Sequence, residues 1–170
     1  MEQIKIGLLG FGKMGKIRHQ TLSQMDQCVA LAVYEYNKEI TTPENLKRIQ
    51  SPEKLIASND IDAVVISVPN YLIKTYVIDS LEAGKHVFCE KPPGINLSEV
   101  LEMKEAMLKS GCKLMFGFNH RHHQSIIKTK EVADSGSFGE ILWMRGRYGK
   151  SVPEDFFDNW RSQKKLAGGG

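Results

Sequence analysis

The sequence predicts an α/β fold with a doubly wound parallel sheet, followed by the start of a second, α+β domain. Strand-like and helix-like segments alternate five times over about the first 118 residues, which is typical of parallel strands joined by right-handed crossovers. A turn with three glycines follows the first apolar run. The alternation ends near Asn119. We therefore expect one domain over residues 1–120 and an incomplete second domain over residues 121–170.

Five apolar runs in the first part have the length and composition of buried strands. Ala63–Val68 is a continuous β-branched run, which is expected of a strand covered on both faces. The run that ends at Cys89 is equally apolar and begins at His86. The other predicted strands are Ile4–Leu9, Val29–Val33 and Lys113–Phe118.

Capping residues mark where the helices begin and end. Asn96 and Glu99 have the spacing of a capping box, and the helix after them should end at Gly111. Proline after Ser or Thr predicts a helix start at Thr42-Pro43 and again at Ser51-Pro52. The remaining helices are predicted from the glycine turn to Met25 and over Tyr71–Glu82.

The sequence of residues 121–170 predicts too few helices and strands for a domain of its own. A helix is expected over Gln124–Ala133 and a strand over Ile141–Tyr148. Aromatic residues follow at Phe156, Phe157 and Trp160. One helix and one strand cannot bury those rings, so they need another surface to pack against.

Composition is that of an ordinary globular protein, with 41% hydrophobic and 25% charged residues. The net charge of +3 is spread among acids without a basic stripe, which argues against a nucleic-acid partner. We find no signal peptide and no apolar stretch of membrane-spanning length, and expect a cytoplasmic protein without a membrane partner. Three cysteines in no zinc pattern predict buried free thiols.

The glycines fit the dinucleotide fingerprint G-x-G-x-x-G of a Rossmann domain. Gly10 permits the tight turn, Gly12 lets the backbone approach a pyrophosphate, and Gly15 lets helix and strand pack closely. The helix that follows offers free N–H groups to phosphates. Glu35, about 20 residues further on at the end of the second strand, suits the ribose hydroxyls. The predicted cofactor contacts here also include Phe11, Lys13 and Met14.

Glu35 favours NAD over NADP, because its carboxylate would repel a 2′-phosphate. Lys13 and Lys38 lie close enough in sequence to accommodate that phosphate, so NADP stays open as the less favoured cofactor.

Charged residues end the strand that begins at His86, in the run Glu90-Lys91-Pro92. Charges at the end of a buried strand need a partner of opposite charge or a ligand. In parallel sheets, ligands bind at the carboxyl ends of the strands. Lys91 is therefore placed where a substrate would meet a cofactor. The alternative is that Lys91 only pairs with Glu90. The Lys91–Pro92 bond is a candidate for a cis peptide.

Several motifs together resemble the glucose–fructose oxidoreductase / inositol dehydrogenase family (Gfo/Idh/MocA). The most specific is Ala83-Gly84-Lys85-His86-Val87 followed by Glu90-Lys91-Pro92. The resemblance covers essentially the whole chain. It also includes Asn59-Asp60-Ile61-Asp62, Pro69-Asn70, Asn119-His120-Arg121, Gly139-Glu140-Ile141, Trp160-Arg161 and Ala167-Gly168-Gly169-Gly170.

The resemblance implies an NAD(P)-dependent enzyme that moves hydride between nicotinamide and a hydroxyl or keto carbon of a sugar, cyclitol or nucleotide-sugar. It implies that Lys91 contacts substrate and assists proton transfer, and that the full-length protein is a homo-oligomer. From the residues themselves we expect no metal site. Cofactor contacts are implied at Val68, Pro69, Asn70, Glu90, Lys91 and Asn119, and substrate contacts at Arg121, Tyr148, Lys150 and Trp160. The alternative for Tyr148 and Lys150 is that they lie on the surface of a sheet without touching substrate.

The chain departs from the family pattern in two residues and in length. Ile73 stands where members often have His, and Gln124 where many have Pro. Members are roughly twice as long, so we expect this chain to lack part of the catalytic domain and to be weakly active or inactive alone. A non-catalytic dinucleotide-binding regulatory protein is the rival hypothesis. The cluster His120, His122 and His123 lacks nearby carboxylates and is interpreted as a junction loop.

Overall fold

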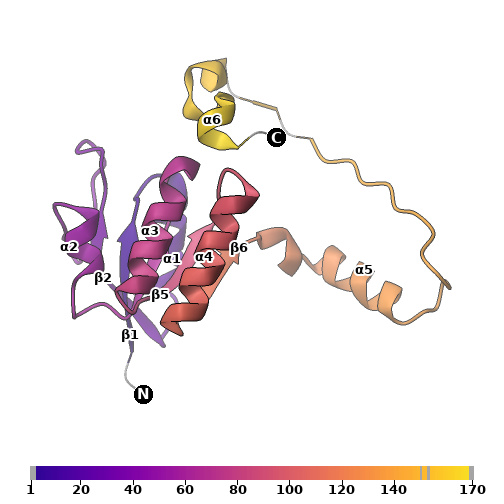
Figure 1. The fold of residues 1–170 in the computed structure, drawn as a ribbon, viewed down its shortest axis with the longest axis horizontal. Coiled ribbons are helices and arrows are strands. Elements are labelled where there is room, and N and C mark those ends of the chain that lie inside the picture. Colours follow the sequence, from indigo (N-terminus) through magenta and orange to yellow (C-terminus); the bar gives the residue numbers. More distant parts are fainter. Residues whose placement is uncertain (1–2, 150, 153, 169–170) are drawn as a thin grey trace.

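A computed structural model of the chain describes residues 3–149, 151–152 and 154–168. Its centre is a six-stranded sheet in the order β3-β2-β1-β4-β5-β6, in which every strand pair is parallel (Figure 1). This is the strand order of a doubly wound dinucleotide fold. The chain adds strands β1 to β3 toward one edge of the sheet and then, from β4 on, toward the other edge. The strands are β1 Ile4–Leu9, β2 Cys28–Tyr34, β3 Lys47–Arg48, β4 Ala63–Ile66, β5 His86–Glu90 and β6 Leu114–Gly117.

Helices cover both faces of this sheet. Val64 on β4 belongs to a core cluster that also takes in Leu81 and Met103 from the helices of one face. Val65, the next residue, belongs to a second cluster with Leu8, and Leu22 packs against that cluster from the other face. Burial on both faces explains the continuous β-branched run. The helices are α1 Lys13–Leu22, α2 Pro52–Ile56, α3 Asn70–Glu82 and α4 Leu97–Ser110.

The capping signals before α2 and α4 are confirmed. Asn96 Oδ1 accepts the Glu99 N–H over 3.0 Å, and Glu99 in turn accepts the N–H of Ile95, one residue earlier than in a standard capping box. Gly111 ends α4 in the left-handed conformation, with φ of 68°. The Ser51 hydroxyl accepts an N–H of the first turn of α2.

The helix expected at Thr42-Pro43 is wrong. The chain makes a single turn there, closed by the Leu46 N–H on the Pro43 carbonyl, and then enters the two-residue edge strand β3. Leu46 is buried in the core, which draws this segment onto the sheet. Arg48 on β3 donates to the carbonyls of Ile40, Glu35 and Asn37 and fixes the preceding loop as irregular backbone.

The second part of the chain is partly as expected. The helix α5 forms over Gln124–Asp134, but residues 141–149 have no regular structure and the expected strand Ile141–Tyr148 is wrong. A strand needs a partner, and none lies beside this segment in the described part of the chain. Figure 1 shows the chain passing from α5 through a long extended segment to short turns that lie above α3 and α4.

Those short turns return to the N-terminal end of α3. They are η2 Glu154–Asp158, η3 Trp160–Ser162 and α6 Lys164–Ala167. The ring of Trp160 meets Tyr71 of α3 edge-on, with centroids 6.2 Å apart. Phe156 and Phe157 contact each other instead. Among the described residues, no helix is both long and apolar enough to span a bilayer.

Candidate functional site

The glycine turn after β1 has the geometry that the fingerprint predicts. Gly10 has φ of 91°, and a side chain there would collide with the Ser67 carbonyl at the end of β4. A side chain on Gly15 would collide with the Gly10 carbonyl, so this glycine lets α1 lie against the turn. An added Cβ on Gly12 meets nothing within 4 Å. The space over Gly12 is therefore open for close approach of a ligand.

The N-terminus of α1 opens onto the same space. Gly12 is the N-cap residue, so no side chain caps the helix, and its first turn carries no acidic residue. Such an end presents free N–H groups and the positive end of the helix dipole to an anion. Of the other predicted contacts in this turn, Lys13 is exposed, Met14 is half-buried, and the Phe11 ring is buried in the core. Phe11 can therefore contribute only its backbone to a ligand.

Glu35, just beyond β2, points its carboxylate at the glycine turn. Its Oε2 accepts the Phe11 N–H over 2.5 Å, and its Oε1 accepts the Asn37 N–H over 2.9 Å. Arg48 also donates to the Glu35 carbonyl, so backbone and side chain are both fixed. The carboxylate thus stands beside the turn, where an adenosine ribose would bring its hydroxyls.

The end of β4 supplies the opposite wall of the turn. Ser67 follows β4, and its Oγ is buried without a hydrogen-bond partner in the described part of the chain. Val68 and Pro69 lead into α3 and are half-buried. Asn70, the first residue of α3, is buried and donates from Nδ2 to the Ala167 carbonyl over 2.9 Å. Its amide is therefore engaged by the returning C-terminal segment.

Glu90, at the end of β5, pairs with Arg18 and not with Lys91, the partner that the sequence analysis left open. Glu90 is buried and forms an ion pair with Arg18 of α1, whose Nε donates to Glu90 Oε1 over 2.6 Å. A terminal nitrogen of Arg18 also donates to Asn119 Oδ1 over 3.1 Å. Lys91 is exposed, and no ion pair between it and Glu90 occurs among the described residues. The Lys91–Pro92 peptide is cis.

Of the three substrate-contact candidates among the described residues, two lie at the same turn and the third lies elsewhere. Arg121 is exposed on η1, the 3-10 turn Asn119–His122, and the Tyr148 ring contacts His120 of that turn with centroids 5.5 Å apart. Trp160 lies instead at the start of α3, with the Arg161 guanidinium 4.5 Å from its ring centroid. Lys150 falls outside the described residues.

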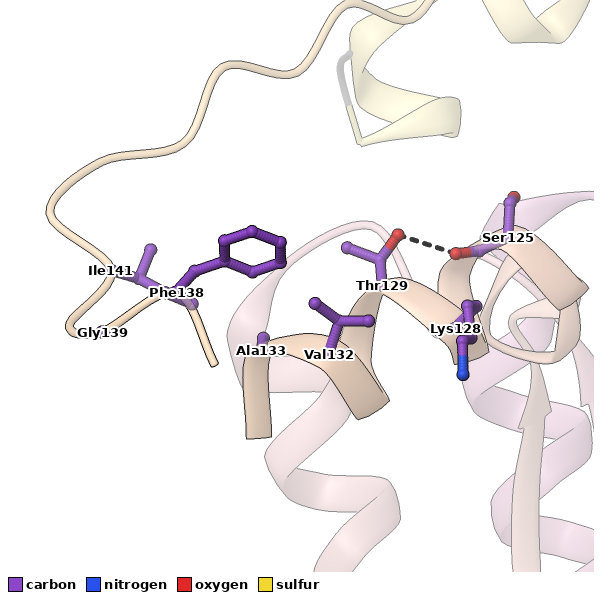
Figure 2. Close-up of a pocket in the computed structure, with 8 residues that line it drawn as sticks. All are labelled: Ser125, Lys128, Thr129, Val132, Ala133, Phe138, Gly139 and Ile141. Carbon is purple, nitrogen blue, oxygen red and sulfur yellow. Dashed lines mark hydrogen bonds between the residues drawn. The ribbon is translucent and has the colours of Figure 1, made fainter. Parts of the chain in front are cut away.

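The apolar hollow in Figure 2 is separate from these residues. It has a volume of about 570 Å³ and lies between α5 and the segment 138–141. None of the predicted site residues lines it, and its polar groups already serve the helix, as where the Thr129 hydroxyl donates to the Ser125 carbonyl. The candidate site is therefore the carboxyl edge of the sheet. Within the described ranges, no cluster of three or more His, Cys, Asp or Glu side chains could hold a metal.

The strand order, the glycine turn and the uncapped helix beside an acidic residue together define a dinucleotide-binding α/β domain. Residues 4–118 match the profile of the oxidoreductase family with an NAD-binding Rossmann fold (GFO_IDH_MocA), and the chain belongs to this family. This confirms the resemblance and the fold class that the sequence predicts.

Two curated relatives illustrate the match. Myo-inositol 2-dehydrogenase of Thermotoga maritima is 32% identical over 160 residues, which cover 90% of this chain and 48% of the relative. Levoglucosan dehydrogenase of Pseudarthrobacter phenanthrenivorans is 30% identical over an alignment of 186 positions, which covers 100% of this chain and 47% of the relative. The chain thus spans about half the length of the curated relatives it matches.

Solved structures agree with the fold. A probable dehydrogenase from Thermotoga maritima has a TM-score of 0.74 at 31% identity, over 80% of this chain and 42% of that one. Apo scyllo-inositol dehydrogenase from Lactobacillus casei has a TM-score of 0.71 at 25% identity, over 82% of this chain and 44% of that one.

Sequence reasoning missed Arg18 and Ser67. Arg18 follows the buried Gly15 by three positions and so lies on the same face of α1, turned to the sheet. A charged residue on a sheet-facing row was a signal that could have identified it. Ser67 carries no comparable pattern, because its hydroxyl stands out only once its burial is known.

Proposed function

We propose that this chain is the cofactor-binding part of an NAD-dependent oxidoreductase that transfers hydride between nicotinamide and a CH–OH or keto carbon of a sugar or cyclitol. The observation that carries the proposal is the placement of an exposed lysine, Lys91, at the carboxyl edge of a sheet whose family binds NAD. The names of the relatives, which act on inositol and levoglucosan, support the substrate class.

The residues at this edge fit such a cofactor. The open space over Gly12 and the uncapped end of α1 suit a pyrophosphate. The Glu35 carboxylate suits two ribose hydroxyls and disfavours a 2′-phosphate, so NAD is the proposed cofactor and NADP the less favoured one. Val68, Pro69, Asn70 and Asn119 are proposed to contact the rest of the cofactor.

Lys91 is proposed to handle the proton of the reaction. A nicotinamide held at this edge would supply the hydride acceptor for the substrate carbon. Lys91 is proposed as the general base that takes the hydroxyl proton of the same carbon, so the carbonyl product forms as one hydride and one proton depart. Arg121, Tyr148, Lys150 and Trp160 are proposed as substrate contacts of the longer protein, which we also propose to be a homo-oligomer.

The domain boundary near residue 120 is part of the proposal. Residues 1–120 form the cofactor domain, and residues 121–170 begin a substrate domain. The family profile ends at residue 118, and the isolated helix α5 follows it.

The test is a titration of the chain with NADH and then NADPH, followed by nicotinamide fluorescence. We expect NADH to bind more tightly than NADPH. Lys91→Met should still bind NADH, because the glycine turn and Glu35 remain. Absence of NADH binding by a chain that still melts cooperatively would refute the proposal. A chain extended to the length of its relatives should then reduce NAD with myo-inositol, and binding without any reduction across cyclitols and sugars would favour a regulatory protein.

A further inference from the structure

The ion pair between Arg18 and Glu90 joins the helix after the glycine turn to the end of β5. The two side chains are only 17% and 10% exposed, and their N–O contact of 2.6 Å is a hydrogen bond as well as an ion pair. A carboxylate removed from water needs a partner of opposite charge. Arg18 is therefore the group that balances the charge of Glu90 at this edge of the sheet.

Three further groups hold the Arg18 guanidinium in place. It donates to Asn119 beyond β6, and its Cζ lies 5.0 Å from the centroid of the Phe88 ring. Gly117 pairs with Glu90 across β5 and β6, and a Cβ there would come within 3.3 Å of Arg18 and 3.5 Å of Glu90. The glycine therefore leaves the room that the ion pair occupies.

This arrangement affects Lys91, the residue that follows Glu90. A free carboxylate next to a lysine attracts the ammonium form and holds its proton. Arg18 offers Glu90 a planar guanidinium with two N–H donors, which a single ammonium does not match. With Glu90 engaged on the α1 side, the exposed amine of Lys91 is left without that neighbour as a partner.

We propose that Arg18 is a positioning residue for the reaction: by engaging Glu90, it keeps the Lys91 amine available to a substrate oxygen. The inference rests on the role proposed above for Lys91. Arg18 acts through Glu90 and does not itself meet the substrate.

The test measures how fast the Lys91 amine is acetylated by a water-soluble N-hydroxysuccinimide ester at one fixed pH, without cofactor. Peptide mass spectrometry gives the rate for Lys91 relative to exposed lysines of the same chain. Arg18→Met keeps an apolar stem over Phe88 and removes the charge. We expect Lys91 to react about threefold to tenfold more slowly in it, because a freed carboxylate favours the ammonium form. Adding Glu90→Gln to this variant should restore the parent rate.

A control variant makes the result decisive. Glu105→Gln breaks an exposed ion pair on α4 and should leave the Lys91 rate unchanged. An unchanged Lys91 rate in folded Arg18→Met would overturn the proposal, as would a double variant that stays as slow as Arg18→Met. If Arg18→Met does not fold, Arg18→Gln is the second variant, and the same outcomes decide. Because no cofactor is present, a failure of NADH binding counts against the proposed function and leaves this result intact.

Discussion

The Glu35 carboxylate forms hydrogen bonds with the backbone of two loops, the glycine turn and the loop after β2. One oxygen accepts the Phe11 N–H in the glycine turn and the other accepts the Asn37 N–H in the loop after β2. These bonds orient the carboxylate before any ligand arrives, which lowers the entropy cost of binding. The same negative charge would meet a 2′-phosphate with repulsion. One residue can therefore set both affinity and the choice between dinucleotides.

Replacing Glu35 by Gln should weaken NADH binding about tenfold or more, because a hydrogen bond to a charged group contributes roughly 1.5–3 kcal/mol. NADPH binding should weaken less or improve, since the repulsion is gone. Fluorescence titrations of both nucleotides measure the two effects. Glu39→Gln, in the same exposed loop, is the matched control and should change neither. An equal loss for both nucleotides would show that Glu35 acts only through the fold of the loop.

Cys89 should be chemically inert in the folded protein. Burial, with the neighbouring Glu90 charge as a smaller cause, raises the pKa of the Cys89 thiol far above its usual range, so almost no thiolate forms. Cys112 is only half-buried. With Ellman's reagent at mildly alkaline pH we expect Cys112 to react first and Cys89 only after denaturant is added. Rapid native labelling of Cys89, located by peptide mass mapping, would show that the end of β5 opens.

At the scale of elements, Lys85 is a buried lysine that connects α2 to the strands. Its Nζ donates to the carbonyls of Ser58 and Ile61, each over 2.8 Å, in the turn between α2 and β4. Lys85→Met would leave two carbonyls short of a donor, at a cost of about 2 kcal/mol in the free energy of unfolding. Urea denaturation measures it. Lys109→Met removes an exposed lysine and should change stability little; equal effects of both variants would contradict this role.

Asp79 on α3 should lower the stability of the fold at neutral pH and have no such effect in acid. Desolvation, then the charges of Glu82 and Glu53, raise the pKa of Asp79 above its ordinary 3.8. The folded chain therefore binds this proton more tightly than the unfolded chain, and the ionised form destabilises the fold above that raised pKa. Asp79→Asn should raise the melting temperature at neutral pH. The gain should vanish as the pH falls through the raised pKa to the ordinary value. A gain that persists in acid would refute the electrostatic cause.

The elements that the sequence predicts correctly are those whose signal is local. The β-branched run before Ser67 identifies β4 because both of its faces are buried, and Asn96 identifies the start of α4 because the cap contact spans three residues. The helix expected at Thr42-Pro43 fails because Arg48 holds that loop through carbonyls 8 to 13 positions away. No local pattern contains such contacts.

The candidate site divides in the same way. The glycine turn and Glu35 follow a fixed spacing, and the structure gives them the expected geometry. The partner of Glu90 is 72 positions away in the sequence, so only the fold shows that it is Arg18 and not Lys91. The strand expected at Ile141–Tyr148 has strand-like composition, but a ladder partner is a property of the sheet and not of the segment.

At the scale of the whole molecule, residues 141–149 separate two unequal parts. This segment is exposed and has no regular structure, and it contains Arg145 and Arg147. Beyond it, the returning segment contacts the first part of the chain through the Asn70–Ala167 hydrogen bond, the Tyr71–Trp160 rings and the close approach of Gly168 to the Ile95 backbone. The six-stranded sheet and the glycine turn lie entirely before α5. The cofactor site should therefore not depend on the returning segment for its fold.

Limited trypsin digestion should test this division, because proteases cut exposed, irregular backbone first. We expect early cleavage after Arg145 or Arg147, identified by intact mass, while the lysines of α1 and α4 are spared. The long fragment, purified by size exclusion, should bind NADH nearly as the parent chain does and melt in one cooperative transition. Arg145→Gln/Arg147→Gln should delay the first cut. First cleavage within residues 3–118, or loss of NADH binding once the returning segment is removed, would instead make that segment an integral wall of the cofactor site.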